Sequence, residues 1–148
     1  MNGLKEACKL LLDEGLENVF ARHHRMAEGV RAAVQAWGLK LCAETPDVYS
    51  DTVSAIRTPD GFNATDIVTH AASTYGVAVG VGLGDVAGKV FRIGHLGSLP
   101  DVMALSGIAT AEMCMVDLGL DIKLGSGVAA AQEYYRHGAP MSQKVAAE

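Results

Sequence analysis

The sequence predicts an α+β domain of two layers, a mainly antiparallel sheet with helices packed on it. Before residue 38, apolar residues recur every three or four positions, which is the spacing of amphipathic helices. Around residues 77–95 the spacing changes to two, which indicates strands, and helical spacing returns after residue 101. The expected order is helix, helix, strand, strand, helix, hairpin, helix. That order suggests an antiparallel sheet covered by helices.

Two helices are expected at the start of the chain. The first ends at Gly15, and its apolar stripe consists of Leu4, Cys8, Leu11 and Leu12. The second ends at Gly38, and its apolar positions are Leu16, Val19, Phe20, His23, Ala27, Val30, Val34 and Trp37. Within it, the adjacent pair His23 and His24 does not indicate a metal site, because neighbouring helical residues point about 100° apart. We interpret both histidines as structural.

Two short strands and a third helix are expected in the middle of the chain. Residues 39–42 and 53–56 have the composition of strands. Asn63 or Thr65 can cap the helix that follows, and Gly76 ends it.

The C-terminal part is expected to be helical. Ser98 with Asp101 forms a plausible capping arrangement, with Pro100 in the first turn, and the helix continues to Gly119. Its methionines favour adaptable core packing over a cofactor role; they are Met103, Met113 and Met115. Residues 128–136 predict a short terminal helix.

The stretch 75–97 carries the strongest functional signal. Val77, Val79 and Val81 alternate with small residues and predict a strand. Glycines then punctuate a polar turn, and Lys89 to His95 resumes as a second strand. The sequence therefore predicts a hairpin with a glycine-rich connection.

Arg92 is the most chemically informative residue of this hairpin. Since successive strand residues point to opposite faces, Phe91 and Ile93 share one face while Val90 and Arg92 share the other. A guanidinium is thereby placed in an apolar, sheet-like setting behind the glycine bend. Composition alone favours an ordinary solvated arginine, because arginine is mostly exposed.

The glycines of the turn also match a dinucleotide-binding fingerprint. Gly82 to Ala87 formally fits G-x-G-x-x-A after a strand. That motif requires a helix opening at the glycines, so that its N-terminus can hold the pyrophosphate. Because residues 89–93 are expected to form a strand, we favour a hairpin turn whose glycines supply positive φ angles.

Three separated segments resemble class V aminotransferases. Gly82-Leu83-Gly84 with residues 88–97, GKVFRIGHLG, is similar to the family's C-terminal signature. Residues 15–24, GLENVFARHH, resemble the segment that opens its small domain, and residues 123–134, KLGSGVAAAQEY, resemble the end of a bacterial subgroup. That subgroup is serine–glyoxylate aminotransferase, a relative of alanine–glyoxylate aminotransferase. The three motifs occur in the right order across nearly the whole chain.

The resemblance implies a fold-type I C-terminal domain with defined boundaries. Residues 1–15 would be a helix leading in from a large N-terminal domain, residues 16–137 the small domain, and residues 138–148 a frayed tail. In the family the arginine of the R-I-G motif binds the α-carboxylate of the substrate, which corresponds to Arg92. No catalytic residue and no metal ligand is expected in this chain.

The family's cofactor is pyridoxal phosphate, which a lysine of the large domain holds as a Schiff base. None of the six lysines of this chain matches that lysine, so we expect no covalent cofactor on it; they are Lys5, Lys9, Lys40, Lys89, Lys123 and Lys144. The resemblance also implies a homodimer, with the large domain of the same enzyme as partner, and small amino acids and 2-oxo acids as substrates.

The expected function is that of the C-terminal part of a transaminase, beginning at an internal methionine. The complete enzyme would move an amino group from serine (or alanine) to glyoxylate, with Arg92 as the carboxylate clamp, whereas this chain alone lacks the catalytic apparatus. Two alternatives stay open: a stand-alone module that binds small carboxylates, and a catalytically inert truncated fragment.

Composition excludes several other classes. The 148 residues are 49% hydrophobic and 20% charged, which is typical of one globular domain rather than a disordered chain. The net charge of −5 gives no reason to expect nucleic-acid binding, and no apolar stretch predicts a membrane span. The N-terminus lacks the features of a secretory signal, and the three cysteines lie far apart. We expect a cytoplasmic protein with reduced thiols.

Overall fold

The structure is a computed structural model that describes residues 2–137. Its strands form one antiparallel sheet in the order β1-β2-β4-β3. They are β1 (Lys40–Leu41), β2 (Val53–Arg57), β3 (Gly80–Val81) and β4 (Val90–Gly94). The central pair runs from Val53 opposite Gly94 to Arg57 opposite Val90. Together with the helices, this sheet confirms the predicted α+β class.

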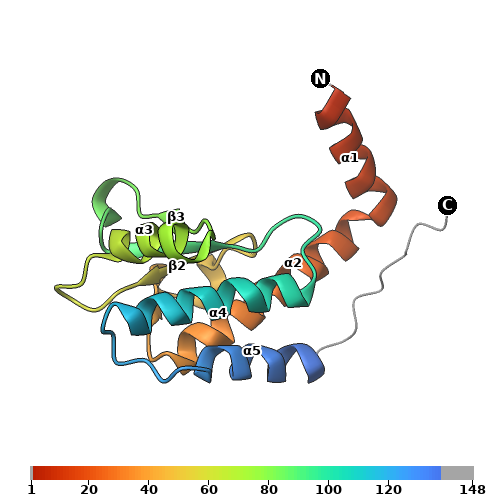
Figure 1. Ribbon diagram of the computed structural model, residues 1–148. Helices are drawn as coiled ribbons and strands as arrows, with labels where there is room; N and C mark the ends of the chain where they lie inside the picture. Colours follow the sequence, from red (N-terminus) through yellow and green to blue (C-terminus); the bar gives the residue numbers. More distant parts are fainter. Residues whose placement is uncertain (1, 138–148) are drawn as a thin grey trace.

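The described part of the chain contains five α-helices (Figure 1). They are α1 (Asn2–Glu14), α2 (Leu16–Ala36), α3 (Ala64–Tyr75), α4 (Asp101–Asp117) and α5 (Ser126–His137). As predicted, Asn63 caps α3, because its side chain accepts the Thr65 N–H at 3.1 Å, and Gly76 ends it with a φ of 67°. Helices α4 and α5 lie below the strands in the figure, and α1 projects away from the body.

One face of the sheet is packed on helices; the other, which we call the open face, is more exposed around Arg92, although Val90 on that face is buried. Ile56, Phe91 and Ile93 are buried and form one core with apolar side chains of α2, α3 and α4. The helical members of this core include Met26, Val30, Val34, Ile67, Ala71, Ile108 and Met115. Ala55 and Arg92, whose positions point to the opposite face, are only half-buried and lie outside the core.

Helix α5 packs on α2 at a position where only glycine fits. A Cβ atom on Gly29 would lie 2.1–2.3 Å from ring and hydroxyl atoms of Tyr135. The Tyr135 hydroxyl donates to the Met26 carbonyl at 3.0 Å, and the Arg25 guanidinium lies 5.3 Å from the centre of its ring. Burial raises the pKa of Tyr135, so its hydroxyl stays protonated and serves as a donor.

A buried carboxylate joins α4 to the start of α5. Glu112 is 1% exposed, and it accepts the Trp37 indole N–H at 2.9 Å. It also accepts the backbone N–H groups of Gly125 at 2.9 Å and Gly127 at 2.8 Å. N–H groups at the beginning of a helix have no acceptor within the helix itself, so Glu112 acts as a cap for α5 that another helix supplies.

The predicted cap of α4 is wrong. The N-cap of α4 is Pro100, and no side chain caps this helix. Asp101 points instead to α2, where its Oδ2 lies 2.7 Å from Nη2 of Arg25. The Asp101 carboxylate, which the local pattern assigned to the cap, instead forms an ion pair with a neighbouring helix.

Three apolar residues that were predicted to be in the core are exposed. Leu16 is 47% exposed, Phe20 58% and Met103 59%. Helical spacing is correct at these positions, but the described part of the molecule does not cover these ends of α2 and α4. Strand β3 is also shorter than predicted, because the N–H of Val77 bonds the Ala71 carbonyl at the end of α3.

Helix α1 has no buried residue. Its predicted apolar stripe is exposed, with Leu4 at 74%, Leu11 at 39% and Leu12 at 68%. Within residues 2–137, no helix is long and apolar enough to cross a membrane. The same residues hold no cluster of three or more metal-ligating side chains.

Candidate functional site

The β3–β4 hairpin presents Arg92 on the open face of the sheet. Its cross-strand neighbours are Ala55 on β2 and Gly80 on β3, so the three residues share one face. Both neighbours are small, and the Arg92 side chain itself occupies the room over Gly80. The predicted alternation is therefore confirmed, since Phe91 and Ile93 are in the core and Arg92 is not. A three-residue 3₁₀ turn, and no α-helix, follows the glycines, which excludes the dinucleotide fingerprint there.

The Arg92 side chain is held at one end and free at the other. Its Nε donates to the Val81 carbonyl at 2.8 Å. The Arg92 side chain lies so close to Gly80 that a Cβ atom on Gly80 would be 3.1 Å from Arg92 Nε. Among residues 2–137 its two terminal nitrogens have no hydrogen-bond or ion-pair partner. The two terminal nitrogens of the planar guanidinium are therefore available to bind a carboxylate through two hydrogen bonds.

Two further cations lie on the open face. Arg57 is two residues from Ala55 on β2, and Lys40 lies directly opposite Arg57 on β1. In the described part of the chain neither makes an ion pair. Like charges opposite one another on a sheet are unfavourable. This face therefore favours an anionic neighbour.

A buried histidine fixes the strand end next to Arg92. His95 is 1% exposed; its Nδ1 lies 3.0 Å from the Asp51 carbonyl and its Nε2 lies 2.9 Å from the Ser54 hydroxyl. Because a carbonyl can only accept, Nδ1 carries the proton and Nε2 accepts from Ser54. Burial lowers the pKa of His95, which keeps the ring neutral.

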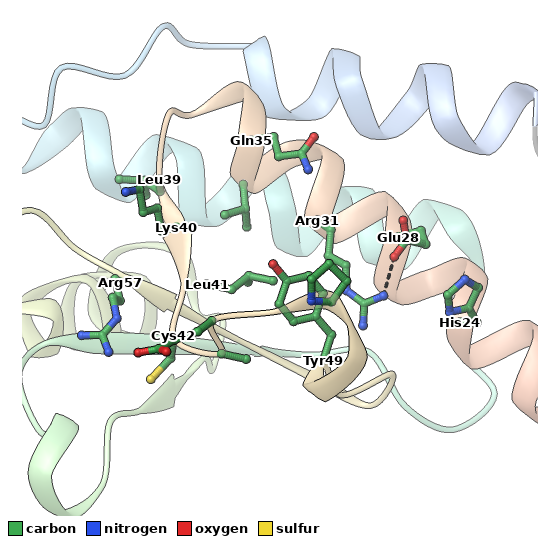
Figure 2. Close-up of a pocket in the computed structure, with 14 residues that line it drawn as sticks. His24, Glu28, Arg31, Gln35, Leu39, Lys40, Leu41, Cys42, Tyr49 and Arg57 are labelled. Carbon is green, nitrogen blue, oxygen red and sulfur yellow. Dashed lines mark hydrogen bonds and ion pairs between the residues drawn. The ribbon is translucent and has the colours of Figure 1, made fainter.

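A separate cleft of about 750 Å³ lies beside β1 (Figure 2). Its residues include Arg31, which contacts Glu28, and Tyr49, whose ring centre lies 5.1 Å from the Arg31 guanidinium. Arg31 also donates to Asp51 at 2.8 Å, so the charges around it are neutralised by one another. Arg57 lines this cleft, whereas Arg92 does not.

Known proteins with a similar sequence are aminotransferases. Over 147 residues the chain is 71% identical to an L-aspartate–glyoxylate aminotransferase of Paracoccus denitrificans. Over 142 residues it is 54% identical to a serine–glyoxylate aminotransferase of Hyphomicrobium methylovorum. The chain belongs to the class V aminotransferases. No family model matches it.

Solved structures of the family share the fold. Pyridoxamine–pyruvate aminotransferase of Mesorhizobium loti superposes with a TM-score of 0.87 at 36% identity, over 93% of this chain and 36% of that chain. Ureidoglycine–glyoxylate aminotransferase of Bacillus subtilis superposes with a TM-score of 0.80 at 26% identity, over 86% of this chain and 33% of that chain. The chain spans 37% of the Paracoccus relative and 35% of the Hyphomicrobium relative, as one domain of a longer protein would. The full-length members of the family depend on pyridoxal phosphate.

The lysines of the described residues do not fit a covalent site for that cofactor. Lys5, Lys9, Lys40, Lys89 and Lys123 are all exposed. Lys40 lines the cleft beside β1, at the edge of the sheet and opposite exposed Arg57. A lysine that forms a Schiff base needs an enclosed pocket that lowers its pKa. Lys144 lies outside the described residues, as does the tail predicted for residues 138–148.

The sequence pattern missed the contacts that hold the Arg92 strand in place. The helical spacing placed His23 on the apolar side of its helix, and the pattern indicated no partner for Arg22. Both contact Gly97, which follows β4. These residues lie in two of the segments that resemble the family, so the shared motifs were the only available signal.

Proposed function

We propose that the chain is the C-terminal small domain of a glyoxylate-dependent transaminase, and that Arg92 binds the α-carboxylate of its amino-acid substrate. The domain comprises residues 16–137, preceded by the helix of residues 1–15, and the large domain of the family is its partner. The amino donor is a small amino acid, serine or alanine. The Paracoccus relative, which is named for aspartate, adds that amino acid to the set to be tested.

The single observation that supports this role is the free end of Arg92. Its Nε is anchored on Val81, and its terminal nitrogens belong to a face that carries two more cations without an ion pair among residues 2–137. Charge-assisted hydrogen bonds contribute about 1.5–3 kcal/mol each, and a pair of them fixes the orientation of a carboxylate as well as its distance. Pyridoxal phosphate, when bound by the large domain, supplies the site where the amino group is held. This chain supplies the anchor for the acid group.

The test is a titration of the isotope-labelled chain, followed through its arginine Nε–Hε resonances. L-serine is expected to shift the Arg92 resonance saturably, whereas L-serine methyl ester, which lacks the carboxylate, is expected to leave it in place. The Arg92→Lys variant is expected to lose the response of the backbone amides around residue 92. A wild-type Arg92 resonance that ignores L-serine at every concentration would remove Arg92 from the site.

A second experiment separates a small domain from a complete enzyme. The chain is mixed with pyridoxal phosphate, reduced with borohydride and digested, and the labelled lysines are identified by mass spectrometry. The expected result is weak labelling of several exposed lysines. Stoichiometric labelling of one lysine would show that the chain carries its own cofactor site.

A further inference from the structure

The backbone just after β4 is held by two side chains from the start of α2. Arg22 donates through Nη1 to the Gly97 carbonyl, and the Gly97 N–H donates to Nε2 of His23 at 3.0 Å. Nδ1 of His23 lies 2.7 Å from the Val19 carbonyl, so Nδ1 carries the proton and Nε2 is free to accept. Both polar groups of one glycine are thus bound by adjacent residues of another element.

These two hydrogen bonds from Arg22 and His23, which we call the Gly97 clamp, hold the residue that follows Leu96. Gly94 shares the open face with Arg92, because its partner Val53 is two residues from Ala55. A Cβ on Gly94 would meet Cδ2 of Leu96 at 3.4 Å, so the tip of Leu96 lies over Gly94 on the open face. Leu96 is 60% exposed and therefore has little packing of its own to hold it there.

The Gly97 clamp is also connected to α1. Arg22 donates to Oε1 and Oε2 of Glu14 through Nε and Nη2, both at 2.8 Å. This contact lowers the pKa of Glu14, so the carboxylate remains charged. Glu14 is the last residue of α1, and Gly15, with a φ of 86°, separates the two helices. Arg22 therefore joins the end of α1 to the segment that follows the Arg92 strand.

We propose that Arg22 and His23 are positioning residues that hold Leu96 and Gly97 beside Arg92, so that Leu96 forms the apolar wall of the carboxylate site. They act through Gly97 and do not touch the ligand. This inference rests on the proposed role of Arg92, but its structural part can be measured without a ligand.

The experiment uses the full chain and three variants. His23→Leu removes the acceptor for the Gly97 N–H, whereas His23→Gln keeps an oxygen that can reach it. His24→Leu is the matched control, because His24 lies 3.1 Å from the Asp51 carboxylate and does not contact Gly97. Each protein is measured for hydrogen exchange of the Gly97 amide, for the Arg92 Nε–Hε resonance, and for L-serine binding.

The expected result is a coordinated change in His23→Leu alone. Exchange at Gly97 accelerates, the Arg92 resonance moves, and the affinity for L-serine falls about 2- to 12-fold, the size of one lost neutral hydrogen bond. His23→Gln restores all three, and His24→Leu leaves them unchanged. A merely structural role would lower the melting temperature without moving the Arg92 resonance.

Three outcomes separate this inference from the proposed function. An Arg92 resonance that stays in place when Gly97 exchange accelerates would overturn the positioning role, as would unchanged exchange at Gly97. If the resonance moves and glutamine restores it, but L-serine binds neither wild type nor variant, the positioning role stands and the carboxylate assignment fails.

Discussion

Replacing Gly29 with alanine tests the packing of α5 on α2 directly. The added Cβ would lie 2.1–2.3 Å from the Tyr135 ring, whereas carbon atoms in contact lie about 3.5–4.0 Å apart. The ring must therefore retreat by roughly 1.3 Å to restore an ordinary contact. Its hydroxyl lies 3.0 Å from the Met26 carbonyl, so this retreat breaks the hydrogen bond.

The expected magnitude follows from three contributions. Overpacking costs about 1–3 kcal/mol, and the lost hydrogen bond costs about 0.5–1.5 kcal/mol. The higher helix propensity of alanine offsets about 1 kcal/mol of this. The net loss in the free energy of unfolding is about 1–3 kcal/mol, which lowers the melting temperature by about 3–9 °C for a chain of this length.

Gly107 in α4 is the matched control. It also lies inside a helix, but a Cβ there would meet nothing within 4 Å. Gly107→Ala is therefore expected to gain about 0.5–1 kcal/mol and to raise the melting temperature. The assay is urea and thermal unfolding followed by circular dichroism. Shifts of the same sign in both variants would refute the contact between Gly29 and Tyr135.

Three further predictions concern the ligand anchor and two buried polar side chains. In a full-length enzyme that carries this domain, Arg92→Lys should raise the KM for the amino donor about 10- to 150-fold, since one charge-assisted bond of about 1.5–3 kcal/mol is lost; an unchanged KM in steady-state kinetics would contradict it. Glu112→Gln replaces one of the two acceptor oxygens with an NH2 group, which leaves at least one N–H unpaired at the start of α5 and should cost about 1–3 kcal/mol in urea unfolding, whereas exposed Glu133→Gln should change stability by less than about 0.5 kcal/mol. Burial lowers the pKa of His95 below 6.5, so its contribution to stability is complete above that pH and is lost as the pH falls from 6.5 to the lowered pKa. The slope should reach at most about 1.4 kcal/mol per pH unit, and an equally steep slope in His95→Gln would show that another group is responsible.

The face on which Arg92 lies could be predicted because strand alternation is a local property. Val90, Phe91, Arg92 and Ile93 alternate in the sequence, and the pleat converts that order into two faces whatever the partner strands are. Helix ends were predictable for the same reason, since a glycine such as Gly76 can take a positive φ angle without cost. The carboxylate role itself came from the resemblance, not from the pattern.

The contacts that position the site could not be predicted in this way. His23 and Gly97 are separated by 74 positions, and a helical period shows only that His23 faces inward. Likewise, the pattern predicted that Asp101 belongs to a helix cap, whereas in the folded chain its carboxylate accepts a hydrogen bond from Arg25. Exposure of Phe20 was missed because periodicity identifies an apolar face and not the element that covers it.

The segment 92–97 combines strand alternation, which the sequence shows, with long-range contacts, which it does not show. Its alternate positions serve two purposes: one set points to the open face and the other anchors the strand. The open-face residues are Arg92, Gly94 and Leu96, and the anchors are Ile93 in the core, His95 on Ser54 and Asp51, and Gly97 on Arg22 and His23. A ligand that meets this face would therefore find a cation at Arg92 and the apolar tip of Leu96 over Gly94, each next to a residue that is anchored on the other side of the strand. Such preorganisation reduces the ordering cost of binding, so loosening an anchor should weaken binding even though the anchor never touches the ligand.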